Sequence, residues 1–232
     1  MSCALCSDNA SYFYNTATNR KAIVKNNQNG NNTPQYETSA PQTLITTPVM
    51  KLTTGRVYCR RTDIEKDFFR LEFPPWVNII ACTEKKELVL IRQYRYGTDR
   101  IELEIPGGAV NDVVEPPLAA GLRELLEETG YAGENARIIG KVSPNPAIQN
   151  NFCYTVLVEN VQKVRRPALD EMEDIDVLLV PEDEAFACIE DGSIAHGLVL
   201  NALMFYALTR KKTAWQWGPA DVLGAAPEST LS

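Results

Sequence analysis

Hydrophobic residues recur in short runs or in alternation from about residue 50 to about residue 210, between turns rich in glycine, proline or charged residues. Short runs of β-branched and aromatic residues are typical of strands. In the segment 100–105 the alternation places the apolar residues on one face and Glu102 and Glu104 on the other. The pattern predicts strands over 54–61, 67–73, 76–82, 87–94, 100–105, 136–142, 152–158 and 175–180.

The apolar spacing changes to a helical period over 117–129, 182–189 and 195–210. The first of these segments opens with prolines, which suit a first helical turn, and closes at Gly130. Many strands, one central helix and two late helices predict an α+β fold, an α/β/α sandwich around a mixed β-sheet.

Composition separates the two ends from this pattern. Residues 26–32 consist almost wholly of asparagine and glutamine, and such a segment cannot bury enough apolar area to offset its ordering entropy. We therefore expect a flexible extension over 1–45, a single catalytic domain over 46–212 and a loose tail over 213–232. The N-terminus also lacks the apolar core of a secretory signal.

The chain has 232 residues, of which 44% are hydrophobic and 23% charged, as in an ordinary globular protein. A net charge of −7 argues against holding nucleic acid by bulk charge. No apolar stretch approaches the ~20 residues of a membrane-spanning helix. Neither a nucleic acid nor a membrane is therefore an expected partner.

The six cysteines are mostly scattered, which favours free thiols in a reducing compartment and a cytoplasmic location. Cys3 and Cys6 have C-x-x-C spacing, but no second cysteine pair or histidine cluster completes a zinc site. Basic residues after a Ser/Thr/Asn-rich start leave organelle targeting open as an alternative.

The helix over 117–129 carries the most informative chemistry. Glu124, Glu127 and Glu128 converge on one patch, where like charges are unfavourable, and Arg123 can reach Glu127 at i+4. A solvated charged face would explain these residues, as it does for most Glu-rich helices. A hard divalent cation such as Mg²⁺, which takes oxygen ligands, would also resolve the repulsion.

The spacing around this helix decides between the two interpretations. Glu115, followed by RELLEETGY over 123–131, resembles the Nudix box G-x5-E-x7-R-E-U-x-E-E-x-G-U, in which U is bulky and apolar. The departure is at the front, where the expected glycine falls on Ala109 and Gly107 and Gly108 precede it. The segments LVLIRQYRYG and ELEIPGG, over 88–97 and 102–108, resemble the ADP-ribose pyrophosphatase branch of the family.

The resemblance implies the Nudix fold and roles for named residues. Glu124 and Glu128 would be the main ligands of Mg²⁺, with Mn²⁺ as an alternative, and Glu127 would bind a further metal or activate water. Arg123 would orient the carboxylates, and the carbonyl of Gly108 or Gly107 would complete the metal site.

Substrate recognition rests on Arg92, Arg95 and Glu104. Guanidinium groups suit phosphate, so the two arginines near the end of the strand over 87–94 are candidate substrate-binding residues, or else form surface ion pairs. Glu104 is expected to hydrogen-bond the ligand or to pair with an arginine. The loop amides 149–151 can contact substrate or form a polar loop. A structural role is favoured for His196.

The catalytic base is open. The loop over 143–151, where many relatives carry a glutamate, contains no carboxylate, so the base is Glu171 or Glu173, or the helix carboxylates and metal suffice.

The resulting expectation is a homodimeric, Mg²⁺-dependent hydrolase that cleaves an ADP-ribose-like nucleoside diphosphate sugar to a nucleoside monophosphate and a sugar phosphate. The alternatives are a Nudix hydrolase of a triphosphate or dinucleotide, and a sensor that binds a nucleotide sugar without cleaving it.

Overall fold

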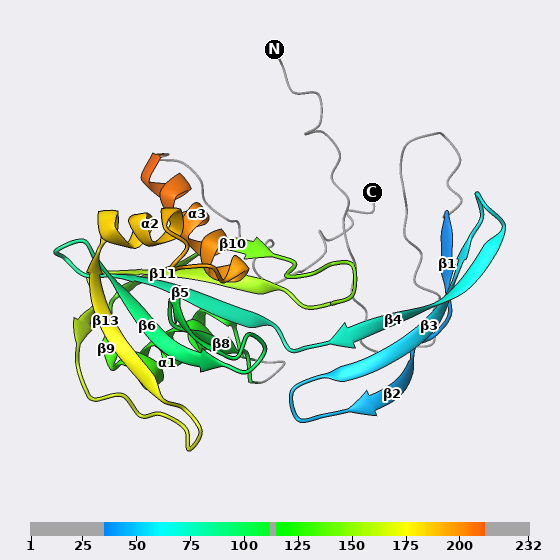
Figure 1. Ribbon diagram of the computed structural model, residues 1–232, viewed down its shortest axis with the longest axis horizontal. Helices are drawn as coiled ribbons and strands as arrows, with labels where there is room; N and C mark the ends of the chain where they lie inside the picture. Colours follow the sequence, from blue (N-terminus) through cyan, green and yellow to red (C-terminus); the bar gives the residue numbers. More distant parts are fainter. Residues whose placement is uncertain (1–34, 112–114, 212–232) are drawn as a thin grey trace, which may run out of the picture. The chain divides into compact units, whose positions relative to one another are not determined.

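The computed structural model describes residues 35–111 and 115–211, which divide at Phe73 and Pro74 into two compact units. The first unit contains four antiparallel strands (Figure 1). β3 (Lys51–Cys59) pairs with β4 (Ile64–Glu72) along its whole length. On its other edge it pairs with β1 (Tyr36–Thr38) and β2 (Gln42–Thr46). Within residues 35–73 there is no helix to cover either face of this sheet.

The second unit is built on a seven-stranded mixed sheet, in which only β5 and β11 run parallel. Its main path follows the order β10-β11-β5-β6-β13. These strands are β10 (Asn135–Val142), β11 (Cys153–Glu159), β5 (Trp76–Cys82), β6 (Glu87–Arg95) and β13 (Ile175–Pro181).

The centre of this sheet is split. β5 and β6 pair only at Cys82 and Leu88. Beyond that point β7 (Arg100–Glu104) pairs with β6, and β8 (Gly107–Ala109) pairs with β5. The turn at Ile105–Pro106 therefore carries the chain across the gap between the two halves of the sheet.

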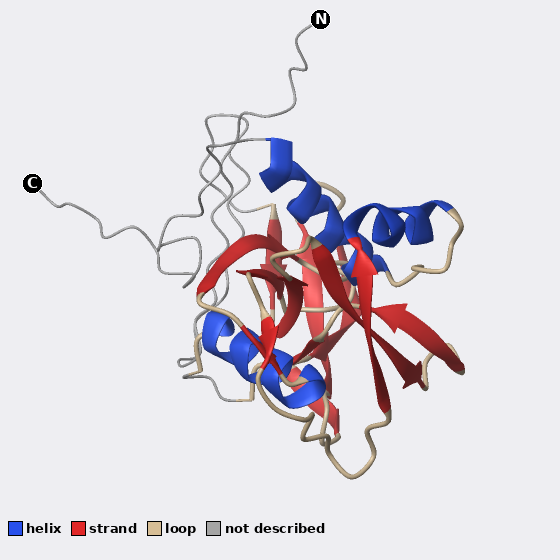
Figure 2. Ribbon diagram, turned by 90° about the vertical axis from the view of Figure 1, so that its left-hand side faces the viewer, coloured by secondary structure: helices blue, strands red, loops and turns tan. Residues whose placement is uncertain are grey.

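Helices cover both faces of the sheet, which gives three layers (Figure 2). α1 (Pro117–Thr129) packs on one face over a core that includes Val77, Ile79 and Val156. α2 (Glu182–Glu190) and α3 (Gly197–Lys211) pack on the other, over the remaining core residues. The alternation of strand side chains supplies both apolar faces. A small pair, β9 (Tyr131–Ala132) and β12 (Gln162–Lys163), follows α1.

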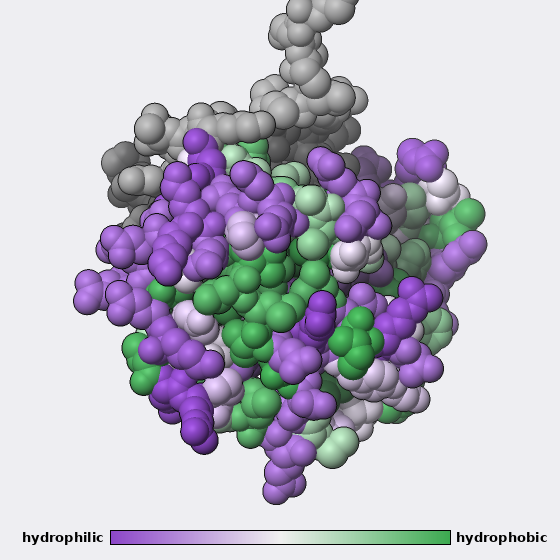
Figure 3. All heavy atoms as spheres, turned by 60° about the vertical axis from the view of Figure 1, so that its left-hand side comes forward, coloured by the Kyte–Doolittle hydropathy of each residue, from purple (hydrophilic) through white to green (hydrophobic). Residues whose placement is uncertain are grey.

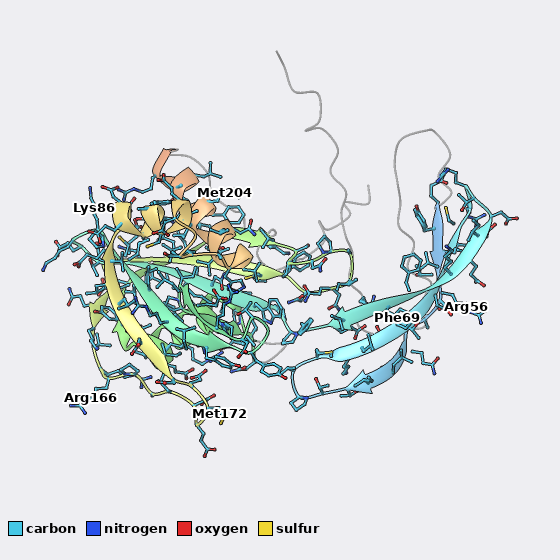
Figure 4. All side chains as sticks on the ribbon, viewed as in Figure 1. Arg56, Phe69, Lys86, Arg166, Met172 and Met204 are labelled. Carbon is cyan, nitrogen blue, oxygen red and sulfur yellow. The ribbon has the colours of Figure 1, made fainter. Side chains whose placement is uncertain are left out.

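The surface of this unit carries some exposed hydrophobic side chains. On the face drawn in Figure 3, hydrophilic side chains surround a smaller hydrophobic group. Met172 in the loop after β12 and Met204 on α3 point outward from separate elements (Figure 4), with exposed fractions of 96% and 50%. None of the helices within 35–111 and 115–211 combines the length and apolarity needed to cross a lipid bilayer.

The predicted elements are largely present, and the α+β sandwich is confirmed. One expectation is corrected: the end of the segment 1–45, predicted to be flexible, contains β1 and most of β2, because β3 supplies an edge for both. The division at Phe73 and Pro74 falls inside the predicted domain 46–212. The predictions for residues 1–34 and for the tail 213–232 lie outside the described residues.

Candidate active site

α1 fixes the position of the acidic residues. Prolines stand at its start, and Gly130 ends it in the left-handed conformation with φ 74°, donating its N–H to the Leu126 carbonyl at 3.1 Å. Leu125 is fully buried against the sheet. Glu128 follows Leu125 by three residues, shares its face and is only 3% exposed.

Arg123 gathers three of the carboxylates. Its guanidinium donates to Glu115 at 3.1 Å, and to Glu124 and Glu127 at 3.0 Å each. It also donates to the Ala109 carbonyl at 3.2 Å. The contact with Glu127 is the i+4 pair predicted from the sequence, whereas the pairing with Glu115 was not predicted. Hydrogen bonding to Glu115, with help from the other two carboxylates, raises the pKa of Arg123.

The two glycines of β8 lie against Glu128 and Glu124. The Gly107 N–H donates to Glu128 at 3.0 Å. A side chain on Gly108 would overlap the carboxylate of Glu124, so glycine permits this close approach. Gly107 and Gly108 follow a proline, a sequence that favours a turn, but they form a short strand because they complete the edge of β5.

Glu128 has little positive charge to compensate its burial. Burial raises the pKa of its carboxyl to about 8, the Gly107 hydrogen bond opposes that rise, and the Glu124 carboxylate adds to it. Burial is also the main reason that the pKa of Glu124 is raised. Burial thus destabilises the charged forms of two neighbouring carboxylates, and a bound cation would stabilise those charged forms.

Arg95 and Glu104 form a second, compensated pair. Glu104 is 2% exposed and accepts two hydrogen bonds from Arg95, at 3.0 and 2.7 Å. The Nδ1 atom of His196 lies 3.2 Å from the same carboxylate. Burial alone would raise the pKa of Glu104, but His196 and Arg95 outweigh it and lower the value to about 2. Of the two outcomes open for Glu104, the arginine pair is the one observed.

Arg92 is separated from this pair. It is exposed and lies on the opposite face of β6 from Arg95, since side chains alternate along a strand. Its register partner on β7 is Leu103, which packs on the core beneath α2 and α3. The structure therefore places Arg95, whose charge acts on Glu128, on the face of β6 that α1 covers and leaves Arg92 on the other face.

The loop that leads into β13 contributes Glu173. Its charge acts on Glu124 and Glu128, raising their pKa, and on Arg95. Its side chain is partly buried and accepts the Asp170 N–H at 3.0 Å, whereas Glu171 is exposed. Asn151 instead has a structural contact, a 3.2 Å donation to the Pro74 carbonyl.

The chemistry of this donor set fits a divalent cation. Within residues 35–111 and 115–211, no three acidic, histidine or cysteine side chains are already arranged around a common point as ligands. Glu124 and Glu127 point instead to Arg123. Nonetheless, Glu128 is a buried carboxylate without an arginine of its own, next to Glu124 and at a glycine strand, and all these donors are hard oxygens.

Comparison with known proteins identifies the family. Residues 72–199 match the NUDIX domain, over more than half of the chain. The chain is 27% identical to the ADP-ribose pyrophosphatase of Bacillus subtilis (strain 168) over 139 residues, which cover 60% of this chain and 75% of that protein. It is 29% identical to the methanol dehydrogenase activator of Bacillus methanolicus over 136 residues, covering 58% and 73%.

A solved structure titled as an ADP compounds hydrolase has the same fold, with a TM-score of 0.67 at 20% sequence identity. The match covers 76% of this chain and 95% of that one. The chain belongs to the Nudix family, and the predicted class of enzyme, a Nudix-type pyrophosphohydrolase, is confirmed. Nudix hydrolases generally use divalent metal ions.

Proposed function

We propose that the chain cleaves the pyrophosphate bond of an ADP-ribose-like nucleoside diphosphate sugar, giving a nucleoside monophosphate and a sugar phosphate. The observation that carries the proposal is Glu128, a buried carboxylate next to Glu124 that accepts a hydrogen bond from the N–H of Gly107. The similarity to an ADP-ribose pyrophosphatase supports the substrate class.

The metal site of this proposal consists of Glu124, Glu127, Glu128 and the carbonyl of Gly108. We propose Mg²⁺ as the ion, with Mn²⁺ as a substitute. Bound there, the ion would neutralise phosphate charge and acidify a water molecule. Arg123 holds Glu124 and Glu127 at 3.0 Å and so fixes the direction in which their oxygens point.

The substrate phosphates would meet Arg95, whose guanidinium is held in place by the buried Glu104. In the reaction the water oxygen bonds to one phosphorus, and the bond from that phosphorus to the bridging oxygen breaks. The bridging oxygen leaves with the electron pair on the second phosphate. We propose that Glu173 accepts the water proton, because its charge acts on Glu124, Glu128 and Arg95 alike.

The test is a substrate panel with product identification. ADP-ribose, other nucleotide sugars, dinucleotides and nucleoside triphosphates are incubated with the protein and Mg²⁺ or Mn²⁺. We expect AMP and ribose 5-phosphate from ADP-ribose, with the highest kcat/KM in the panel. Preference for a triphosphate or dinucleotide would overturn the substrate class, and binding without turnover on every compound would point to a sensor.

Two matched pairs of variants test the roles. Glu128→Gln is expected to lower kcat by about 100-fold or more, whereas Glu184→Gln, on the exposed side of α2, leaves it unchanged. Glu173→Gln is expected to lower kcat by about 10²–10⁴-fold, whereas Glu171→Gln, the other candidate base in the same loop, should leave kcat unchanged. Equal activity of Glu173→Gln and Glu171→Gln would remove Glu173 as the base.

We further propose a homodimer and a cytoplasmic location. The exposed apolar side chains on β2 and β4 support an interface between copies. The four cysteines in the described part of the chain are free thiols, as expected in a reducing compartment.

A further inference from the structure

His196 lies directly before α3, yet its side chain reaches the carboxylate that holds Arg95. The Nδ1 atom is enclosed and lies 3.2 Å from Glu104 Oε1, which also accepts from Arg95 Nε at 3.0 Å. The 3.2 Å contact is not aligned as a linear hydrogen bond, and Nδ1 has no other partner among the residues described. Glu104 is thus the group that this nitrogen faces.

The backbone around His196 is anchored on both sides. Ile194, two residues earlier, is 1% exposed and donates its N–H to the Cys188 carbonyl at 2.8 Å. The His196 carbonyl accepts the Leu200 N–H at 3.0 Å, and Asn78 on β5 donates to the Leu198 carbonyl at 3.1 Å. The ring therefore projects from a backbone segment that is held in place on both sides.

The charge of Glu104 determines which ring nitrogen carries the proton. A neutral imidazole has one N–H and one lone pair. A lone pair on Nδ1 would face an ionised carboxylate across 3.2 Å, which is repulsive, whereas a proton on Nδ1 is attracted to it. The proton is therefore assigned to Nδ1. The ring then attracts Oε1 of Glu104, while Arg95 donates a hydrogen bond to each of the two carboxylate oxygens.

We propose that His196 is a positioning residue for substrate binding: through its Nδ1 proton it fixes Glu104, and Glu104 in turn fixes the guanidinium of Arg95 toward the substrate phosphates. The inference rests on the proposed function of Arg95. It assigns to His196 no contact with substrate and no proton transfer in the reaction. Its loss is therefore expected to weaken substrate binding rather than to slow the chemical step.

Three substitutions test this role by steady-state kinetics on ADP-ribose. His196→Ala should raise KM by about 3–10-fold with kcat within about twofold of wild type. His196→Asn places an amide nitrogen where Nδ1 lies and should restore KM, whereas His196→Gln places it further out, near the Nε2 position, and should not. Equal KM values in wild type and His196→Ala, or equal losses in all three variants, would overturn the proposal.

A second measurement does not depend on activity. His196 is the only histidine in the chain, so the imidazole nitrogens of ¹⁵N-labelled protein give one assignable set of NMR signals. We expect the neutral ring to be protonated at Nδ1, and the signals to shift in Glu104→Gln. Protonation at Nε2, the form that free imidazole side chains favour in water, would overturn the contact.

The two measurements also separate this inference from the proposed function. If no compound in the panel is hydrolysed but Nδ1 carries the proton, the proposed function fails and the contact stands. If ADP-ribose is hydrolysed but His196→Ala leaves KM unchanged, the function stands and the positioning role fails.

Discussion

Glu104 and Glu128 are both almost fully buried, yet their pKa values move in opposite directions. Burial raises the pKa of each. Glu104 has His196 and two bonds from Arg95 to offset that cost, and its pKa falls to about 2. Glu128 has one backbone N–H and a neighbouring carboxylate, and its pKa rises to about 8. Similar burial thus yields one residue that holds a guanidinium and one whose charged form a bound cation would stabilise.

The first prediction concerns the stability that Glu104 provides. A carboxyl whose pKa is lower in the folded state stabilises the fold above its unfolded value of 4.5, and this contribution is lost as the pH falls toward 2. At pH 7, Glu104→Gln should lower the free energy of unfolding by on the order of 2–3 kcal/mol.

Urea unfolding at several pH values measures this contribution. The difference between wild type and Glu104→Gln should be constant above about pH 5 and shrink as the pH is lowered to 3.5. Glu184→Gln, which removes an exposed carboxylate, should follow the wild type throughout. A difference that grows as the pH falls would contradict the assigned direction of the shift.

The second prediction concerns Glu128 and the cation. Because an ion that binds only the folded protein stabilises it, millimolar Mg²⁺ should raise the Tm of the wild type by about 2–5 °C. In Glu128→Gln the same addition should have little effect, since the amide lacks the negative charge. Chelation with EDTA should reverse the increase. An equal rise in Tm for both proteins would place the ion elsewhere.

At the scale of elements, β8 lies against two carboxylates of the site, with Gly107 at Glu128 and Gly108 at Glu124. Gly107 and Gly108 are neighbours on one short strand, but their side-chain positions meet different atoms. A Cβ on Gly107 would lie 2.6 Å from the Val77 carbonyl oxygen, which is backbone and cannot move freely. A Cβ on Gly108 would meet the end of the Glu124 side chain, which can move.

This difference gives the third prediction. Gly107→Ala should cost about 1–3 kcal/mol of stability, as overpacking against backbone does. Gly108→Ala should change stability by less than about 1 kcal/mol but lower kcat about 10-fold or more, because it displaces a metal ligand of the proposed site. Gly97→Ala, whose Cβ meets nothing within 4 Å, is the control for both. If Gly108→Ala retained its activity, the position of Glu124 would not matter for the reaction, and Glu124 would not be a metal ligand.

Local signals explain which elements were predictable. The bounds of α1 follow from its prolines and from Gly130, and the strand over 76–82 follows from its apolar run, so both match the structure. β8 was missed because a Pro-Gly-Gly sequence favours a turn, and only the free edge of β5 makes it a strand. β1 and β2 were missed for the same reason, since the edge of β3 lies beyond their local sequence.

The site was predictable only where its residues are close in sequence. Arg123 and Glu127 are one helical turn apart, so their contact followed from spacing. His196 is far along the chain from Glu104, and no local pattern indicates that the start of α3 meets β7. Arg92 and Arg95 looked equivalent in the sequence. Because β6 extends to Arg95, the alternation of side chains along the strand places the two arginines on opposite faces.

At the scale of the whole molecule, the first unit exposes apolar residues on both faces of its sheet. Phe68 and Phe69 are consecutive on β4, so they project to opposite faces, and they are 56% and 58% exposed. Phe69 is labelled on this strand in Figure 4. Leu44 and Ile45 on β2 are similarly exposed. An apolar sheet that no helix within residues 35–73 covers is typical of a surface that binds another protein, and we propose that a second copy covers it.

The last prediction tests the proposed homodimer. Light scattering coupled to size-exclusion chromatography should give twice the mass of a single chain. The double variant Phe68→Ser/Phe69→Ser should shift the protein toward monomer, because each phenylalanine buried at an interface contributes about 1.5–3 kcal/mol. Its fold should persist, since neither side chain belongs to a core.

Lys66→Ser/Asp67→Ser, on the same exposed strand, is the matched control and should remain dimeric. A monomeric wild type over the whole accessible concentration range would rule out the homodimer. A dimer that both double variants leave intact would instead place the interface away from β4. In that case we would expect Phe68 and Phe69 to bind a different protein, because exposed phenylalanines on both faces of one strand favour association with another chain.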